Sequence, residues 1–225
     1  MKHPVILFDF DGTLVNTTPL ILHSFRATWQ RHFGFTLEDS AYINTFGTLL
    51  HTALQQLTQR SIDDGRVAPV DDLSALADEL LRSYREFNWA RHDEMVEPFA
   101  GIQEMLVELK ARGCRLGIVS SKIRAGVERG LELFALREYF DDIIAADDVT
   151  RHKPHPEPLW RALERFAATP DEALYVGDSI HDIAAGRAAS IATAAAAWGP
   201  FPRAELMAQQ PDYVLELPVD LLSVR

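Results

Sequence analysis

Cysteine is almost absent from this sequence, with Cys114 the single one among 225 residues. One cysteine cannot form an internal disulfide, and such scarcity is typical of proteins in a reducing compartment. The sequence also lacks an apolar segment long enough to cross a bilayer, and its N-terminus lacks the apolar stretch of a signal peptide. These absences predict a cytoplasmic protein that makes no use of a membrane.

Positive charge is also scarce. Lysine and arginine number 22 against 33 aspartates and glutamates, which gives a formal net charge of −11. A field of this sign repels phosphate backbones and anionic lipid, so we expect neither nucleic acid nor a membrane surface as a partner. Any phosphate must be captured locally. Hydrophobic residues make up 47% of the chain, which is enough for a core without disulfides.

The chain opens with an unbroken apolar run, Val5 to Phe8, which predicts a strand buried on both faces of a parallel sheet. The run ends in Asp9 and Asp11, which point the same way along an extended strand, and Gly12 lets the chain turn. Carboxylates held together repel each other unless a proton, cation or ligand intervenes. An Asp-Gly hairpin is the alternative, although residues 18–33 have helical periodicity rather than a second strand. This stretch alone leaves a catalytic and a purely structural role open.

The rest of the chain divides into two parts. Apolar spacing predicts only helices in the first part, over residues 18–33, 50–57 and 73–84. From Pro98 helices alternate with short strand candidates, at residues 115–120, 143–146, 173–176, 191–196 and 213–215. Such alternation predicts an α/β fold with a doubly wound parallel sheet. We therefore expect an α/β core domain of residues 1–16 and 95–225, interrupted by a helical domain of residues 17–94.

Polar side chains follow four of the predicted strands, at the edge where open α/β sheets bind ligands. They are Asp9 and Asp11, then Ser120, Ser121 and Lys122, then Lys153, and finally Asp178 with Asp182. Each has a structural alternative: the serines as helix caps, the lysines as solvated charges, and the aspartates as turn or first-turn residues. Two of only four lysines lie at these ends, which favours a functional role.

Taken together, Asp9-x-Asp11-Gly12-Thr13, Ser120, Lys153 and Gly177-Asp178-x-x-x-Asp182 resemble, in order, the four motifs of the haloacid dehalogenase superfamily of phosphotransferases. A helical insert directly after the first motif resembles the subgroup with an α-helical cap. That subgroup includes phosphoglycolate phosphatase, related pyrophosphatases and β-phosphoglucomutase. The resemblance implies a Rossmann-like core that carries the chemistry and a cap that closes over the substrate.

The resemblance also implies roles for individual residues. Asp9 would attack phosphorus to form an aspartyl-phosphate, Asp11 would act as acid and base, and Lys153 would neutralise negative charge. Mg²⁺ would be held by the Asp9 carboxylate, the Asp11 backbone carbonyl and Asp178, with Asp182 just behind these ligands. Contacts to the phosphate or substrate would come from Gly12, Thr13, Gly47, Ser120 and Ser121. The cap stretch from Gly47 to His51 would face this site.

We therefore expect a Mg²⁺-dependent phosphatase that acts on a small soluble phosphorylated metabolite such as phosphoglycolate, as a monomer or a homodimer. Asp11 argues against a dehalogenase, because a departing halide needs no acid. Three alternatives remain on the same scaffold: an inorganic pyrophosphatase, a β-phosphoglucomutase-like phosphomutase, and a catalytically idle binding protein. The intact acidic residues and Lys153 argue against the last of these.

Overall fold

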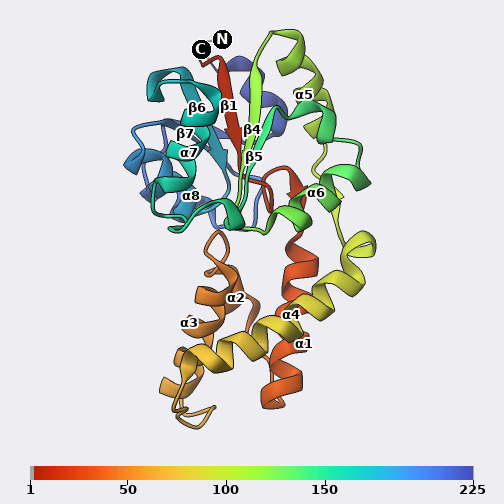
Figure 1. Ribbon diagram of the computed structural model, residues 1–225, viewed down its shortest axis with the longest axis vertical. Coiled ribbons are helices and arrows are strands. Elements are labelled where there is room, and N and C mark those ends of the chain that lie inside the picture. The colour runs from red at the N-terminus through yellow and green to blue at the C-terminus, as the bar shows by residue number, and fades with distance from the viewer. Residues whose placement is uncertain (1–2, 225) are drawn as a thin grey trace.

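The structure is a computed structural model that describes residues 3–224. Figure 1 shows a twisted sheet with helices on both faces and a further group of helices extending from one end of it. Both ends of the described part of the chain lie beside the sheet, away from this group of helices (Figure 1). No helix among the described residues is long and apolar enough to cross a membrane.

The central sheet has six strands, and every neighbouring pair in it is parallel. In spatial order the strands are β5 (Asp142–Ile144), β4 (Arg115–Val119), β1 (Val5–Phe8), β6 (Ala173–Gly177), β7 (Ala192–Ala196) and β8 (Tyr213–Leu215). The chain builds outward from β1 on one side and then returns to build on the other. The strand order therefore reverses at β1, and such a reversal opens a ligand crevice at the carboxyl ends of the strands. The predicted doubly wound parallel sheet is confirmed.

Alternating side chains of β1 divide the core into two layers. Ile6 and Phe8 pack beneath α5 (Ile102–Ala111) and α6 (Arg124–Leu133). Val5 and Leu7 face α7 (Glu157–Phe166) and α8 (Ile180–Ala188) on the opposite side. Both sets are fully buried, which explains why the first strand is an unbroken apolar run.

The segment between β1 and α5 is helical, as predicted, with no strand between residues 18 and 90. Its helices are α1 (Thr18–Phe33), α2 (Asp39–Ile43), α3 (Leu50–Asp63) and α4 (Leu73–Met95). They enclose an apolar cluster of their own, centred on Phe25, Trp29, Tyr42, Leu54 and Leu80. We call these four helices the cap. The division into separate domains with bounds at 16 and 95 stays a prediction.

Two short strands join the cap to the sheet. β2 (Val15–Asn16) and β3 (Glu97–Pro98) pair antiparallel where the chain leaves the core and returns to it. The sequence did not predict them, because two residues are too few to show a period. It also did not predict α9 (Arg203–Ala208).

Several expected bounds need correction. The strand expected at 143–146 ends at Ile144, and a 3₁₀ turn, η2 (Ala146–Asp148), takes over. Helices α3 and α4 extend beyond the predicted 57 and 84, to Asp63 and Met95. The remaining 3₁₀ turns are η1 (Arg137–Tyr139), η3 (Pro170–Glu172) and η4 (Pro218–Ser223).

Candidate active site

Asp9 stands where β1 ends, at the point of strand-order reversal. Its backbone N–H donates to Val176 O at 2.8 Å, which carries the strand pairing one residue further. Strand alternation puts its side chain on the same face as Val5 and Leu7, toward α8. The residue is only 4% exposed. Burying a carboxylate so deeply is costly unless positive charge or hydrogen bonds surround it.

The loop after Asp9 closes over Asp178. Gly12 has φ +81°, and a Cβ there would lie 2.3 Å from Asp178 Oδ2, so only glycine allows this approach. Thr13 Oγ1 donates a 2.7 Å hydrogen bond to Asp178 Oδ1. Trp198 Nε1 in turn donates to the Thr13 carbonyl at 2.9 Å, which holds the loop from outside. The predicted turn at Gly12 thus also brings Thr13 to the carboxylate of Asp178, which is 165 residues further along the chain.

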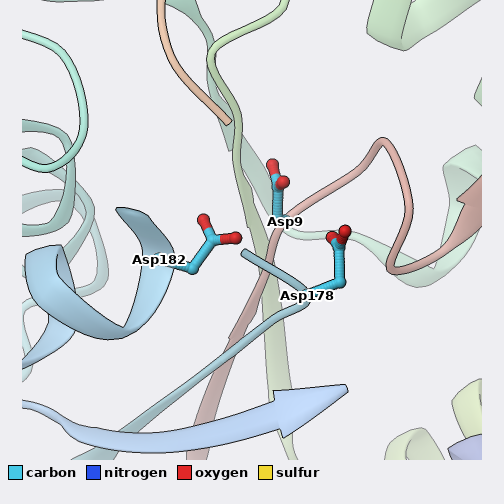
Figure 2. A group of neighbouring side chains, drawn as sticks. All are labelled: Asp9, Asp178 and Asp182. Carbon is cyan, nitrogen blue, oxygen red and sulfur yellow. The ribbon is translucent and has the colours of Figure 1, made fainter. Parts of the chain in front are cut away.

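Figure 2 shows three carboxylates converging from different elements: Asp9 from the end of β1, Asp178 after β6, and Asp182 from the first turn of α8. An oxygen of each lies within 4.8 Å of the other two, and all three side chains are buried. Lys153 supplies one ammonium, 3.0 Å from Asp9 Oδ1 and 2.6 Å from Asp182 Oδ1. Three carboxylates against one ammonium leave a net negative charge that a divalent cation could neutralise.

Burial and the closeness of these charged groups shift the pKa values of the three carboxyls. Burial, with repulsion from Asp182 and Asp11, raises the pKa of Asp9 to about 7 despite the attraction of Lys153. Burial and repulsion from Asp182 and Asp9 raise the pKa of Asp178 well above its ordinary value. Burial also opposes ionisation of Asp182, yet Lys153 and several hydrogen bonds hold its pKa below the ordinary value. Asp9 and Asp178 are therefore the two carboxylates that lack sufficient positive charge, as expected for ligands of a metal ion.

Both oxygens of Asp182 are already occupied by hydrogen bonds within the protein. Oδ1 accepts from Lys153 Nζ and lies 2.9 Å from the Tyr175 hydroxyl. Oδ2 accepts from the backbone N–H of Ser179 at 3.0 Å and from its hydroxyl. This arrangement caps α8 and leaves Asp182 to orient Lys153 rather than to bind a ligand directly.

Tyr175 is a site residue that the sequence analysis missed. Its hydroxyl accepts a 3.0 Å hydrogen bond from Lys153 Nζ, and it lies 3.0 Å from the Val119 carbonyl. The residue is fully buried, and burial together with nearby carboxylates raises its pKa well above the ordinary value. Its position inside an apolar strand run suggested only core packing.

A cavity of about 510 Å³ opens in front of the carboxylates, between the sheet and the cap. Seven of the predicted site residues line it: Asp9, Asp11, Gly12, Gly47, Ser120, Ser121 and Asp178. The whole stretch from Gly47 to His51 lines it too. Thr13, Lys153 and Asp182 are not among its lining residues, but each contacts a residue that is.

The remaining predicted residues make specific contacts at the cavity edge. Lys122 Nζ lies 2.8 Å from Asp11 Oδ1, so the second aspartate is paired separately from the three-carboxylate cluster. Ser121 Oγ donates to the Gly47 carbonyl at 2.7 Å, which joins the core to the cap. Gly47 has φ +83°, and a Cβ there would lie 2.5 Å from Ser179 Oγ. Cap and core thus approach too closely at this point for any larger residue.

The sequence profile of the haloacid dehalogenase-like hydrolases matches residues 6–196, from the first strand to the end of β7. The chain belongs to this family. The cluster of buried acids and one lysine at the strand ends therefore lies in a hydrolase of the haloacid dehalogenase type, and the resemblance drawn from the four motifs is confirmed.

Curated relatives extend the match over the full chain. Pyrophosphatase PpaX of Bacillus cereus strain AH820 is 41% identical over 224 residues, covering 100% of this chain and 97% of the relative. A protein of the same name from Bacillus thuringiensis strain Al Hakam is also 41% identical with the same coverage. Both are phosphatases by name, which supports a hydrolase of phosphate compounds.

Solved structures support the same fold. A crystal structure from Bacteroides fragilis, provisionally named a haloacid dehalogenase-like hydrolase, superposes with a TM-score of 0.88 at 30% identity, covering 98% of this chain and 100% of the other. One from Lactobacillus plantarum, provisionally named a phosphoglycolate phosphatase, has a TM-score of 0.84 at 27% identity and 99% coverage of each chain. Relatives of this family thus bear names of two different phosphatase activities.

Proposed function

We propose that this hydrolase is a Mg²⁺-dependent phosphatase that cleaves a small phosphomonoester through a phosphorylated Asp9. The observation that carries the proposal is the position of Asp9: buried where strand order reverses, lining the cavity, and 3.0 Å from the Lys153 ammonium. Phosphoryl transfer depends mainly on positioning and on neutralising charge, and these residues supply both.

In the proposed reaction an Asp9 oxygen attacks phosphorus while the bond from phosphorus to the ester oxygen breaks. Asp11, which lines the cavity beside Lys122, gives its proton to the departing oxygen. A water molecule then attacks the phosphorus of phospho-Asp9, and Asp11 takes the proton of that water. Inorganic phosphate leaves and the Asp9 carboxylate is restored.

Positive charge comes from two sources. Lys153 stabilises Asp9 and the phosphoryl oxygens, and Ser120 at the cavity surface donates a hydrogen bond to one of them. The raised pKa values of Asp9 and Asp178 support a bound divalent cation, because neither carboxylate has enough positive charge nearby. Asp9, Asp178 and the Asp11 carbonyl would hold Mg²⁺, which would supply Lewis-acid stabilisation of the transferring phosphoryl group. The site is held in shape by the contacts of Gly12 and Thr13 with Asp178, and by the hydrogen bond from Ser121 to Gly47.

The test is a Mg²⁺-dependent phosphatase screen of the purified protein over phosphoglycolate, sugar phosphates, nucleotides and pyrophosphate. Asp9→Asn should abolish turnover and leave the circular dichroism spectrum unchanged. A variant that retained near wild-type phosphatase rates would remove Asp9 as the nucleophile.

The relatives named pyrophosphatase PpaX favour a second candidate, hydrolysis of inorganic pyrophosphate. The same screen separates the two, because it compares pyrophosphate with organic phosphomonoesters. A phosphomutase would instead isomerise β-glucose 1-phosphate in the presence of a bisphosphate primer without releasing phosphate. We expect free phosphate to appear at the rate at which substrate is consumed, with no need for a primer.

A further inference from the structure

The cavity above Asp9 is larger than hydrolysis of a small inorganic anion requires. Its volume of about 510 Å³ falls within the roughly 300–1,000 Å³ of pockets that enclose an organic ligand of moderate size. The phosphate must lie at the carboxylate end if the proposed function is correct. The rest of the cavity, toward the cap, then has to accommodate the group that leaves.

One face of α4 forms part of the cavity wall on the cap side. The lining residues of this helix are Leu81, Tyr84, Arg85, Asn88 and Trp89. Their spacing of three and four residues puts all five on a single helical face. Apolar spacing predicted a helix over residues 73–84, and two of the residues in that pattern, Leu81 and Tyr84, line the cavity.

Arg85 is the distinctive residue of this face. It is exposed and lines the cavity, and the structure shows no hydrogen bond or ion pair between it and any other described residue. The other cation on the cavity surface, Lys122, is already paired with Asp11 at 2.8 Å. Asn88 also has a partner within the protein, since its amide donates a 3.2 Å hydrogen bond to Ser24 Oγ. Arg85 therefore remains available for an anion brought by a ligand.

The lining of the cavity as a whole is largely apolar. α1 contributes Ile21 and Phe25, and the stretch before α3 contributes Phe46, Leu49 and Leu50. Such walls cannot hydrogen-bond a fully charged inorganic anion that loses its water there, whereas they favour hydrocarbon or aromatic groups.

We propose that the substrate is an organic phosphomonoester whose leaving group has an apolar body and a second anionic group, which Arg85 binds. This inference rests on the proposed function and adds the chemical class of the substrate. It also makes inorganic pyrophosphate a poor substrate for this chain, despite the name of its Bacillus relatives.

The inference can be tested by binding, without turnover. The wild-type protein with Mg²⁺ is titrated in a calorimeter with three phosphonates that it cannot hydrolyse: methylphosphonate, benzylphosphonate and 4-carboxybenzylphosphonate. The first mimics phosphate alone, the second adds an apolar body, and the third adds the anion. Burial of the ring should tighten binding about tenfold. The carboxylate should add about tenfold more, as expected for a hydrogen bond to a charged group.

Two arginine variants on one helix complete the experiment. Arg85→Gln should remove the gain from the carboxylate and affect benzylphosphonate much less. Arg82→Gln is the matched control, because Arg82 is exposed on α4 and does not line the cavity, so all three affinities should be unchanged. A carboxylate gain that survives Arg85→Gln overturns the inference; so does a missing gain at either step, or binding of none of the phosphonates.

Failure of the proposed function would look different. If Asp9→Asn retained activity, or no phosphate ester were hydrolysed, the mechanism would be wrong while the two-step gain in phosphonate affinity could still be measured. If the protein hydrolysed pyrophosphate faster than every organic ester, the result would agree with the proposed mechanism and contradict the inferred substrate class.

Discussion

The hydroxyl of Tyr175 accepts a 3.0 Å hydrogen bond from Lys153 Nζ in the layer between the sheet and helices α7 and α8. The same hydroxyl lies within 3.0 Å of the Val119 carbonyl and within 2.9 Å of Asp182 Oδ1, so it can donate to one of them. Tyr175 does not line the cavity, so it holds the ammonium from within the packed core. Lys153 is held by Asp182 and Tyr175 in the direction of Asp9.

Tyr175→Phe should lower kcat about tenfold and leave KM nearly unchanged, because the ammonium loses a partner that orients it but the cavity surface is intact. Steady-state kinetics with p-nitrophenyl phosphate measure both constants. Tyr42→Phe is the control: that residue is a buried tyrosine of the cap whose hydroxyl accepts from the Leu37 N–H at 3.0 Å. Equal effects of the two variants on kcat would reduce Tyr175 to a structural role.

Lys153→Ala should reduce turnover by about 10²–10³, since a buried phosphoryl group and Asp9 would lose their nearest cation. It should also destabilise the fold by about 3–5 kcal/mol, because Asp9 and Asp182 would remain buried without a counter-charge. Turnover and chemical denaturation together test this. Lys110→Ala, which removes a partly exposed ion pair with Asp141, should change neither much. A loss of stability alone would mean that Lys153 has no part in catalysis.

Asp178→Asn should raise the melting temperature of the Mg²⁺-free protein by about 2–4 °C, the shift that about 1 kcal/mol produces in a chain of this size. A carboxyl whose pKa is raised in the folded state opposes folding at neutral pH, because the unfolded chain ionises it freely. Asparagine removes that cost and keeps an acceptor for Thr13. Differential scanning fluorimetry without Mg²⁺ measures the shift.

When Mg²⁺ is present, we expect Asp178→Asn to be less stable than the wild-type protein. Saturating Mg²⁺ should stabilise the wild-type protein by about 3 kcal/mol at a hundred times its dissociation constant, and Asp178→Asn by much less. An unchanged response of the variant to Mg²⁺ would exclude Asp178 from the metal site.

Arg129 on α6 joins the core to the end of α4. Its guanidinium lies 4.5 Å from the Trp89 ring centre, donates to the Trp89 carbonyl at 3.1 Å, and lies 2.9 Å from Asp93. Arg129→Ala should speed hydrogen exchange of residues 84–95 and raise KM several-fold, because the cap wall of the cavity loses an anchor worth about 1–2 kcal/mol. Arg91→Ala, which breaks a contact to Glu94 within α4, is the control. Unchanged exchange would mean that other contacts hold the cap in place.

Much of the architecture could be predicted from local sequence pattern. The apolar run of β1, its acidic end and Gly12 are local features, and each has the conformation that its residues favour. Helical spacing likewise indicated the cap helices, and alternation of helix and strand indicated a parallel sheet. These predictions succeeded because burial imposes a period on the sequence wherever an element has several turns or residues. The two-residue strands β2 and β3 had no such period and were missed.

Local sequence pattern shows which residue types stand at the strand ends, whereas long-range packing sets what each of them contacts. Thr13 reaches Asp178 across 165 positions, and Lys153 reaches Tyr175 across 22. The period of apolar residues shows which face of a helix is turned away from solvent. It does not show whether that face packs against other side chains or lines a cavity. The sequence could therefore not show that Leu81 and Arg85 line the same cavity as Asp9, because that arrangement depends on long-range packing of the cap against the core.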